Sequence, residues 1–168
     1  MRIFLIGFMG AGKSYWGARL NAVTGVEFID LDHCIEERTS KKITTIFEEE
    51  GEEGFRKLEQ KILRDIISQK ENFVMACGGG TPCFFNNLEL MKQQGKVVWL
   101  ASRPKKICER LLRESAHRPL IIKLSAEQLE EFITTTLHSR QIFYQQADII
   151  VDPDLPTAEE ILKKIIDE

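Results

Sequence analysis

One short stretch near the start of the chain constrains its fold more than any other. Residues 7–14 fill the pattern Gly-x-x-x-x-Gly-Lys-Ser, known as the P-loop. An apolar segment at residues 2–6 precedes this stretch, and an amphipathic segment follows it. Glycines allow positive φ and turn several N–H groups towards one anion, while the N-terminus of the following helix points at the same place. A nucleoside triphosphate is the predicted ligand, and a plain strand-to-helix turn is the alternative.

The P-loop also predicts roles for single residues. Lys13 should reach the β- and γ-phosphates of ATP, and the Ser14 hydroxyl should ligate Mg²⁺. The predicted ATP-binding residues of the loop are Gly10, Ala11, Gly12, Lys13, Ser14 and Tyr15. The motif does not identify the acceptor of the phosphoryl group, so the acceptor has to be inferred from other residues.

The composition is typical of one ordinary globular domain. The chain has 168 residues, of which 43% are hydrophobic and 29% charged, and its net charge is -3. We therefore predict a single domain over residues 1–168, without the basic field that holds nucleic acid. No apolar run is long enough to span a membrane, no signal peptide precedes the first strand, and the four cysteines lack metal-binding spacing. We expect a cytoplasmic protein, monomeric by default, with no nucleic-acid or membrane partner.

Apolar segments alternate with amphipathic ones along the chain. The predicted strands are residues 2–6, 26–30, 73–77, 97–100 and 147–151, and the predicted helices are residues 13–23, 35–38, 43–50, 55–70, 84–94, 104–113, 125–144 and 157–166. Strands that are apolar throughout and separated by helices indicate an α/β fold, with a parallel sheet covered on both faces. Ligands of such folds bind beyond the carboxyl ends of the strands.

Polar or glycine-rich residues follow the second and third predicted strands. Asp30 and Asp32 are two residues apart at a strand end, so both carboxylates can point to one side of the sheet. One could hold the water shell of Mg²⁺ and the other accept a proton or hydrogen bond from an attacking hydroxyl; the alternative is that both are solvated acids at a helix start. Residues 78–80 are three glycines, which let a ligand approach the main chain closely or simply form a tight turn.

Two arginines are predicted on the inward sides of helices. Glu59 falls within an apolar stripe and should pair with Arg56, either as a structural ion pair or to aim Arg56 at a substrate carboxylate. Arg140 has the same inward placement on a later helix. Two such arginines in a net-acidic chain indicate an anionic small molecule, although either alone could form a salt bridge in the core.

A long segment without helical periodicity lies between two predicted helices. A loop of this length, about residues 113–124, is usually functional or mobile in a compact domain. We expect it to form a lid that closes over the nucleotide and places the charge of Arg118 on the transferring phosphoryl group. The sequence does not decide between Arg110 and Arg113 as a second nucleotide contact.

Together these motifs resemble the shikimate kinase family, a small branch of the P-loop kinases related to nucleoside-monophosphate kinases. The resemblance covers essentially the whole chain, with its motifs in family order. The matching motifs are the P-loop, Asp30-x-Asp32, Phe55-Arg56-x-x-Glu59, Gly78-Gly79-Gly80, Arg118-Pro119-Leu120 and Arg140-x-x-x-Tyr144. One departure is Tyr15, where the family usually has threonine.

The resemblance implies both a fold and a reaction. The fold would have three layers, with a five-stranded parallel sheet of order 2-3-1-4-5, helices on both faces and a mobile lid. The reaction would be phosphorylation of the 3-hydroxyl of shikimate by ATP with Mg²⁺, giving shikimate 3-phosphate and ADP in aromatic amino-acid biosynthesis.

The resemblance also implies a role for each motif. Lys13, Asp32 and Arg118 would be catalytic, with Asp32 holding the reacting hydroxyl and Arg118 also binding ATP. The metal would be held by Ser14 directly and by Asp30 through water. Shikimate would be bound by Asp32, Arg56, Gly79 and Arg140, the two arginines gripping its carboxylate.

Two other functions remain as alternatives. A related kinase for gluconate or a nucleoside monophosphate would share the P-loop and lid, but the Asp-x-Asp, Phe-Arg and triple-glycine motifs favour a small polyol acid. A GTPase-like switch would need an Asn-Lys-x-Asp motif to bind guanine, which the sequence lacks.

Overall fold

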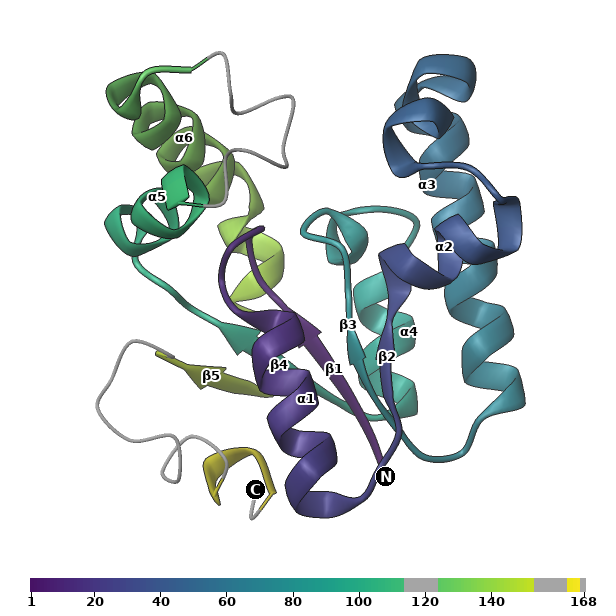
Figure 1. The fold of residues 1–168 in the computed structure, drawn as a ribbon. Helices are drawn as coiled ribbons and strands as arrows, with labels where there is room; N and C mark the ends of the chain where they lie inside the picture. The colour runs from purple at the N-terminus through teal and green to yellow at the C-terminus, as the bar shows by residue number, and fades with distance from the viewer. Residues whose placement is uncertain (114–123, 153–162, 167–168) are drawn as a thin grey trace.

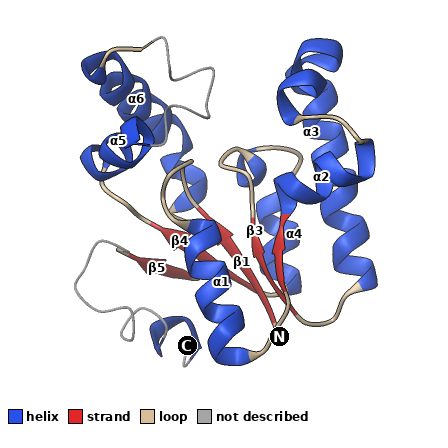
Figure 2. Ribbon diagram, in the orientation of Figure 1, coloured by secondary structure: helices blue, strands red, loops and turns tan. Residues whose placement is uncertain are grey.

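The computed structural model describes residues 1–113, 124–152 and 163–166. Within them a five-stranded parallel sheet has the order β2-β3-β1-β4-β5 (Figures 1 and 2). The strands are β1 (Arg2–Ile6), β2 (Phe28–Asp30), β3 (Phe73–Ala76), β4 (Lys96–Leu100) and β5 (Ile149–Val151). The predicted fold class and strand order are therefore confirmed, and each predicted strand differs by at most two residues at an end.

Helices separate the strands along the chain. They are α1 (Lys13–Thr24), α2 (Leu31–Thr39), α3 (Ile43–Gln69), the 3₁₀-helix η1 (Thr81–Cys83), α4 (Asn87–Gln94), α5 (Pro104–Arg113) and α6 (Ala126–Tyr144). Residues 163–166 are also helical, at the end of the predicted helix 157–166. No helix in these described segments is long and apolar enough to cross a membrane.

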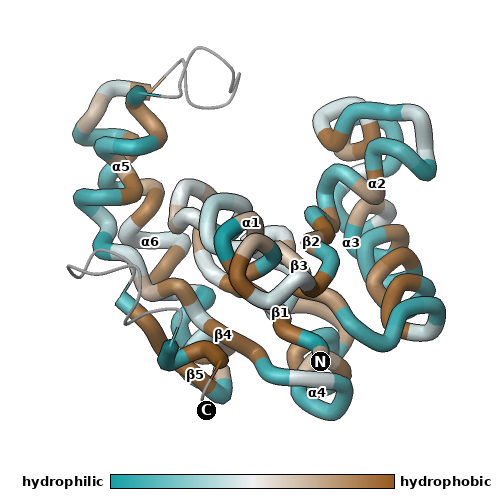
Figure 3. The backbone as a smooth tube through the Cα atoms, turned by 60° about the horizontal axis from the view of Figure 1, so that its bottom comes forward, coloured by the Kyte–Doolittle hydropathy of each residue, from teal (hydrophilic) through white to brown (hydrophobic). Residues whose placement is uncertain are grey.

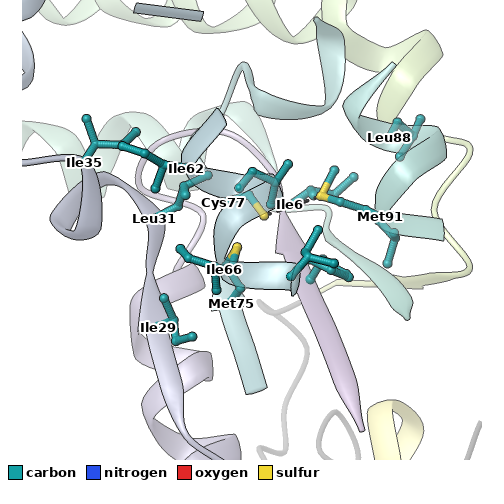
Figure 4. Close-up of a cluster of buried hydrophobic side chains, with 14 of the residues drawn as sticks. Ile6, Ile29, Leu31, Ile35, Ile62, Ile66, Met75, Cys77, Leu88 and Met91 are labelled. Atoms are coloured by element: carbon teal, nitrogen blue, oxygen red, sulfur yellow. Dashed lines mark hydrogen bonds between the residues drawn. The ribbon is translucent and has the colours of Figure 1, made fainter. Parts of the chain in front are cut away.

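Alternate residues of each strand face two separate cores. On β1, Ile3 and Leu5 pack with residues of α1, while Phe4 and Ile6 pack with residues of α3 and α4. The larger core lies between the sheet and the helices α3 and α4, and part of it is drawn in Figure 4. Figure 3 shows α3 alternating between hydrophobic and hydrophilic residues along its length, as expected for a helix with one buried face. The chain thus forms the three layers that the sequence predicted.

The carboxyl ends of the strands lie at one edge of the sheet, called the carboxyl edge below. The P-loop follows β1 there, α2 follows β2 and the glycine turn of residues 78–80 follows β3. In Figure 1, α2 and the start of α3 rise on one side of this edge and α5 and α6 on the other. The candidate residues therefore come together at the centre of that edge.

Several predicted element boundaries are wrong. The predicted break between the helices 43–50 and 55–70 is confirmed, because Gly51 has a non-helical backbone (φ 69°, ψ −178°) that divides α3 into two helices at a kink. The second helix resumes directly after Gly51, earlier than the predicted residue 55. The helix predicted at 84–94 begins only at Asn87, as α4, since Phe85 and Asn86 are left-handed, with φ of 49° and 58°. The 3₁₀-helix η1, which precedes these residues, was not predicted. The lid of about residues 113–124, with Arg118, lies almost wholly outside the described residues.

Candidate active site

The P-loop has the backbone that its glycines predict. Gly7, Gly10 and Gly12 have φ of 139°, 77° and 94°, all in the region that glycine adopts readily. Gly7 has a second constraint, because a Cβ there would lie 2.8 Å from the carbonyl oxygen of Leu100. Gly12 caps the N-terminus of α1, so the first N–H groups of that helix open into the loop. This is an anion-binding arrangement.

Lys13 lies across the loop. Its Nζ donates hydrogen bonds to the carbonyl oxygens of Gly7 and Phe8 at 2.8 and 2.9 Å. The ammonium group is thereby held at the mouth of the P-loop, where a phosphate can accept from it in place of a carbonyl.

Ser14 and Asp30 meet at the junction of the P-loop with β2. Ser14 Oγ donates to Asp30 Oδ2 at 3.0 Å, and Asp30 Oδ1 accepts from the backbone N–H groups of Asp32 and His33. Asp30 is therefore the N-cap of α2, which explains why that helix begins earlier than predicted. The helix-start alternative is correct for Asp30, but the same carboxylate also contacts the P-loop. A hydroxyl and a carboxylate side by side are hard oxygen donors of the kind that Mg²⁺ prefers.

Asp32 is exposed as a whole residue, but its carboxyl is partly desolvated and lies among several charged side chains. Burial of its carboxyl on the protein side, with further repulsion from Asp30 and Glu59, raises its pKa from 3.8 to about 6. Lys13 and Arg56 act in the opposite direction. A carboxyl with a pKa near 6 is ionised at neutral pH and basic enough to take a proton, as general bases require.

Arg56 and Glu59 form the predicted pair inside the protein. Arg56 Nη1 donates to Glu59 Oε2 at 2.9 Å, and the other carboxylate oxygen of Glu59 accepts from Thr81 Oγ1 at 2.6 Å. The Arg56 guanidinium also lies 4.4 Å from the centre of the Phe84 ring. Its buried Nε has no hydrogen-bond acceptor among the described residues. Glu59 thus fixes the orientation of the Arg56 guanidinium, and Nε is left as a buried donor without an acceptor among the described residues.

The glycine turn after β3 is required by three charged side chains. A Cβ on Gly78 would lie 2.8 Å from Glu59 Oε1, one on Gly79 would lie 3.0 Å from Arg140 Nη1, and one on Gly80 would lie 2.3 Å from Arg56 Nη2. The sequence predicted that a ligand approaches this backbone closely. In the structure, the side chains of Glu59, Arg140 and Arg56 approach it closely. Arg140 and Arg56 therefore lie beside two consecutive residues of this turn, Gly79 and Gly80.

Arg140 reaches the glycine turn from α6. Its guanidinium lies 5.8 Å from the centre of the Phe8 ring, which follows β1. One helical turn further on, the Tyr144 hydroxyl donates to the carbonyl oxygen of Gly79 at 2.6 Å. The predicted inward placement of Arg140 is therefore confirmed, and its neighbourhood joins the P-loop side of the site to the glycine turn.

At the base of the lid, the two candidate arginines differ. Arg110 Nη1 donates to the carbonyl oxygen of Gly10 and to Ser102 Oγ, both at 3.1 Å, whereas Arg113 is exposed at the end of α5. Arg110 is therefore the one of the two that contacts the P-loop. The side chain of Tyr15 is exposed and its hydroxyl accepts from Arg19 at 2.9 Å, so the departure from threonine places a tyrosine–arginine contact on the surface.

Two residues of the site, Thr81 and Ser102, were not identified from the sequence, nor was the role of the Tyr144 hydroxyl. Thr81 and Ser102 are buried polar residues, and each donates a hydrogen bond to a residue distant in sequence, Thr81 to Glu59 and Ser102 to the carbonyl oxygen of Ala11. A threonine directly after the glycine run was the one available signal for Thr81. The pairing of Ser102 with Arg110 gave no local pattern.

Several known proteins are similar to this chain in sequence and in fold. The sequence model of the family described as "Shikimate kinase" matches residues 9–168. A shikimate kinase of Azobacteroides pseudotrichonymphae is 45% identical over 165 residues, covering 98% of this chain and 97% of the relative. The crystal structure of shikimate kinase from Bacteroides thetaiotaomicron has a TM-score of 0.93 at 38% identity, covering 100% of this chain and 99% of the other. Shikimate kinase from Acinetobacter baumannii, solved in complex with shikimate, has a TM-score of 0.85 at 36% identity, covering 98% and 89%.

Proposed function

The chain belongs to the shikimate kinase family, and we propose that the residues at the carboxyl edge carry out the family's reaction in the roles given below. The enzyme transfers the γ-phosphoryl group of ATP to the 3-hydroxyl of shikimate, giving shikimate 3-phosphate and ADP in aromatic amino-acid biosynthesis. We take the whole of residues 1–168 as one kinase domain, with the lid at about residues 113–124.

One observation supports the assignment of roles above all others. Asp32 is within electrostatic reach of both Lys13 and Arg56. Lys13 belongs to the phosphate-binding loop and Arg56 is the candidate carboxylate ligand, so Asp32 lies where the two substrates would meet. An acceptor hydroxyl at Asp32 would be close to the γ-phosphate, with its carboxylate anchored at Arg56.

Two arginines and one glycine are proposed to bind shikimate. The guanidinium groups of Arg56 and Arg140 would provide donors for its carboxylate, since a planar guanidinium can bind a carboxylate through two hydrogen bonds. Both groups lie beside the glycine turn, Arg56 next to Gly80 and Arg140 next to Gly79. The main chain of Gly79, next to Arg140, would contact a ring hydroxyl. A ring held at both points has little freedom to rotate, so its 3-hydroxyl can be presented to Asp32.

The transfer itself needs few covalent steps from the protein. Asp32 accepts a hydrogen bond from the 3-hydroxyl and takes its proton as the oxygen bonds to the γ-phosphorus and ADP leaves. The P-loop amides of Gly10, Ala11, Gly12 and Tyr15 and the Lys13 ammonium stabilise the phosphate charge, and Arg118 from the lid adds a second positive charge. These roles follow the general pattern of phosphoryl transfer, in which positioning and charge stabilisation dominate.

Mg²⁺ is the proposed cofactor. Ser14 would ligate it directly and Asp30 through water, because the two side chains already lie 3.0 Å apart beside the helix that follows the P-loop. When bound, the ion neutralises phosphate charge and orients the γ-phosphoryl group. We further propose a cytoplasmic monomer that acts on small molecules and has no nucleic-acid or membrane partner.

The test of this function is ADP release by the purified protein with Mg-ATP. Shikimate, gluconate, AMP and no acceptor are compared in parallel. We expect release above the blank with shikimate alone, and a rise in its KM for Arg56→Ala and Arg140→Ala with little change in the KM for ATP. Release that depends on gluconate or AMP and not on shikimate would contradict the substrate assignment while leaving ATP binding intact.

A further inference from the structure

Tyr144 is a buried tyrosine whose hydroxyl reaches the glycine turn. The side chain is fully buried, and its ring packs against Trp99 of β4 with 5.6 Å between ring centres. From this fixed ring, the hydroxyl donates to the carbonyl oxygen of Gly79 at 2.6 Å, across 65 positions of sequence. Packing alone would be satisfied by phenylalanine, so the hydroxyl calls for a separate explanation.

The same hydroxyl is also linked to Arg140. Burial raises the pKa of Tyr144 to about 12, while Arg140 lowers it through its charge and a side-chain hydrogen bond. Tyr144 therefore stays protonated and keeps its proton for Gly79. Arg140 lies one turn before Tyr144 on α6, and its Nη1 is 3.0 Å from the place of a Cβ on Gly79. One hydroxyl thus joins both groups.

We propose that Tyr144 is a positioning residue for shikimate, whose hydroxyl fixes the Gly79 main chain and the Arg140 guanidinium relative to each other. This inference rests on the proposed function, which gives Gly79 and Arg140 to shikimate binding. Because Tyr144 is fully buried, it would act on shikimate through Gly79 and Arg140 and not by direct contact. Without its hydroxyl, both groups would have to be ordered by the substrate, and the entropy lost in ordering them would weaken shikimate binding.

The test compares Tyr144→Phe with the matched hydroxyl deletion Ser139→Ala. Ser139 is exposed on the same helix and bonds only to the backbone of Thr136 at 2.8 Å, as far as the described residues show. For Tyr144→Phe we expect the KM for shikimate to rise about threefold to tenfold, as for one lost hydrogen bond, with the KM for ATP unchanged. For Ser139→Ala both constants should stay at wild-type values. Circular dichroism and Tm confirm that both variants are folded.

A double-mutant cycle separates positioning from general loosening of the structure. Tyr144→Phe combined with Arg140→Lys should raise the KM for shikimate by less than the product of the two single effects, because both act through one contact. Equal changes in the KM for shikimate and for ATP, or a lowered Tm with an unchanged KM for shikimate, would overturn the positioning role.

The same measurements separate this inference from the proposed function. A shikimate KM that rises for Arg140→Ala but not for Tyr144→Phe would leave the substrate site intact and overturn the inference. A shikimate KM unchanged by Arg140→Ala would overturn the Arg140 assignment itself and, with it, the shared role of Tyr144.

Discussion

Glu59 is fully buried and accepts a hydrogen bond from Arg56, with 2.9 Å between Oε2 and Nη1. The exposed Glu52 lies on the other side of the same guanidinium, 3.4 Å from Nη2. The two carboxylates therefore offer a direct comparison between a buried and an exposed partner of one arginine. The buried one sets the orientation of Arg56, because Thr81 fixes its second oxygen.

Glu59→Gln should destabilise the protein and weaken shikimate binding. The amide keeps the shape of Glu59 but leaves the Arg56 charge without its buried partner, which typically costs about 3 kcal/mol or more. We expect the free energy of unfolding in urea to fall by about that amount and the KM for shikimate to rise. Glu52→Gln, the matched control, should change stability by about 1 kcal/mol or less. Equal losses in the two variants would show that burial of the pair has no special importance.

The raised pKa of Asp32 predicts a pH dependence of catalysis. Its carboxyl has a pKa of about 6, so the ionised form that accepts the substrate proton is lost below that pH. We expect kcat/KM for shikimate to fall about tenfold for each pH unit below 6, since kcat/KM reports groups of the free enzyme. Asp32→Asn should lower kcat strongly and remove this limb from the residual activity. An unchanged limb in the variant would assign it to another group.

The same shift predicts how Asp32 affects stability. Because its pKa is higher in the folded protein than the usual 3.8, the folded state binds this proton more tightly than the unfolded chain. Stability from this group is present below pH 3.8 and is lost as the pH rises to about 6. Asp32→Asn should therefore have a higher Tm than the wild type at pH 8 and nearly the same Tm at pH 3.5. A lower Tm for the variant at pH 8 would contradict a pKa raised by desolvation.

Local patterns were enough to predict much of the fold and part of the site. The P-loop, the alternation of strands and helices and the Arg56–Glu59 pair are visible in short stretches of sequence, and the structure has each of them. The strand order came from the family resemblance, because strand pairing is long-range and leaves no local pattern.

The unpredicted parts depend on contacts between distant residues. Tyr144 and Gly79 are 65 positions apart, and Arg110 and Gly10 are 100 apart. The sequence shows a tyrosine on a helix and an arginine near a loop, but not which backbone carbonyl each will meet. Gly51 shows the reverse case, because the break in α3 depends on the positive φ of a single glycine and was therefore predictable from the local sequence.

Ser14→Ala should reduce the response of the enzyme to Mg²⁺. The change removes the proposed direct ligand and its hydrogen bond to Asp30. Asp30 itself should still cap α2, because its carboxylate accepts the backbone N–H groups there. We expect a titration of activity with Mg²⁺ to show a half-saturating concentration at least about tenfold higher, with full loss of activity in EDTA for both proteins. Thr134→Ala, an exposed hydroxyl on α6, is the control. A wild-type Mg²⁺ titration curve for Ser14→Ala would rule out its hydroxyl as a ligand.

Gly80→Ala and Gly17→Ala should separate loss of substrate binding from loss of stability. Gly80 has an ordinary φ of −93°, but a Cβ there would lie 2.3 Å from Arg56 Nη2 and force the guanidinium to move. We expect a raised KM for shikimate, an unchanged KM for ATP and a small change in Tm. A Cβ on Gly17 would instead lie 2.1 Å from the Phe28 ring, between α1 and β2. That overpacking should cost about 1–3 kcal/mol in urea unfolding without altering either KM. If Gly80→Ala left the shikimate KM unchanged, Arg56 could not be gripping the substrate from its observed position.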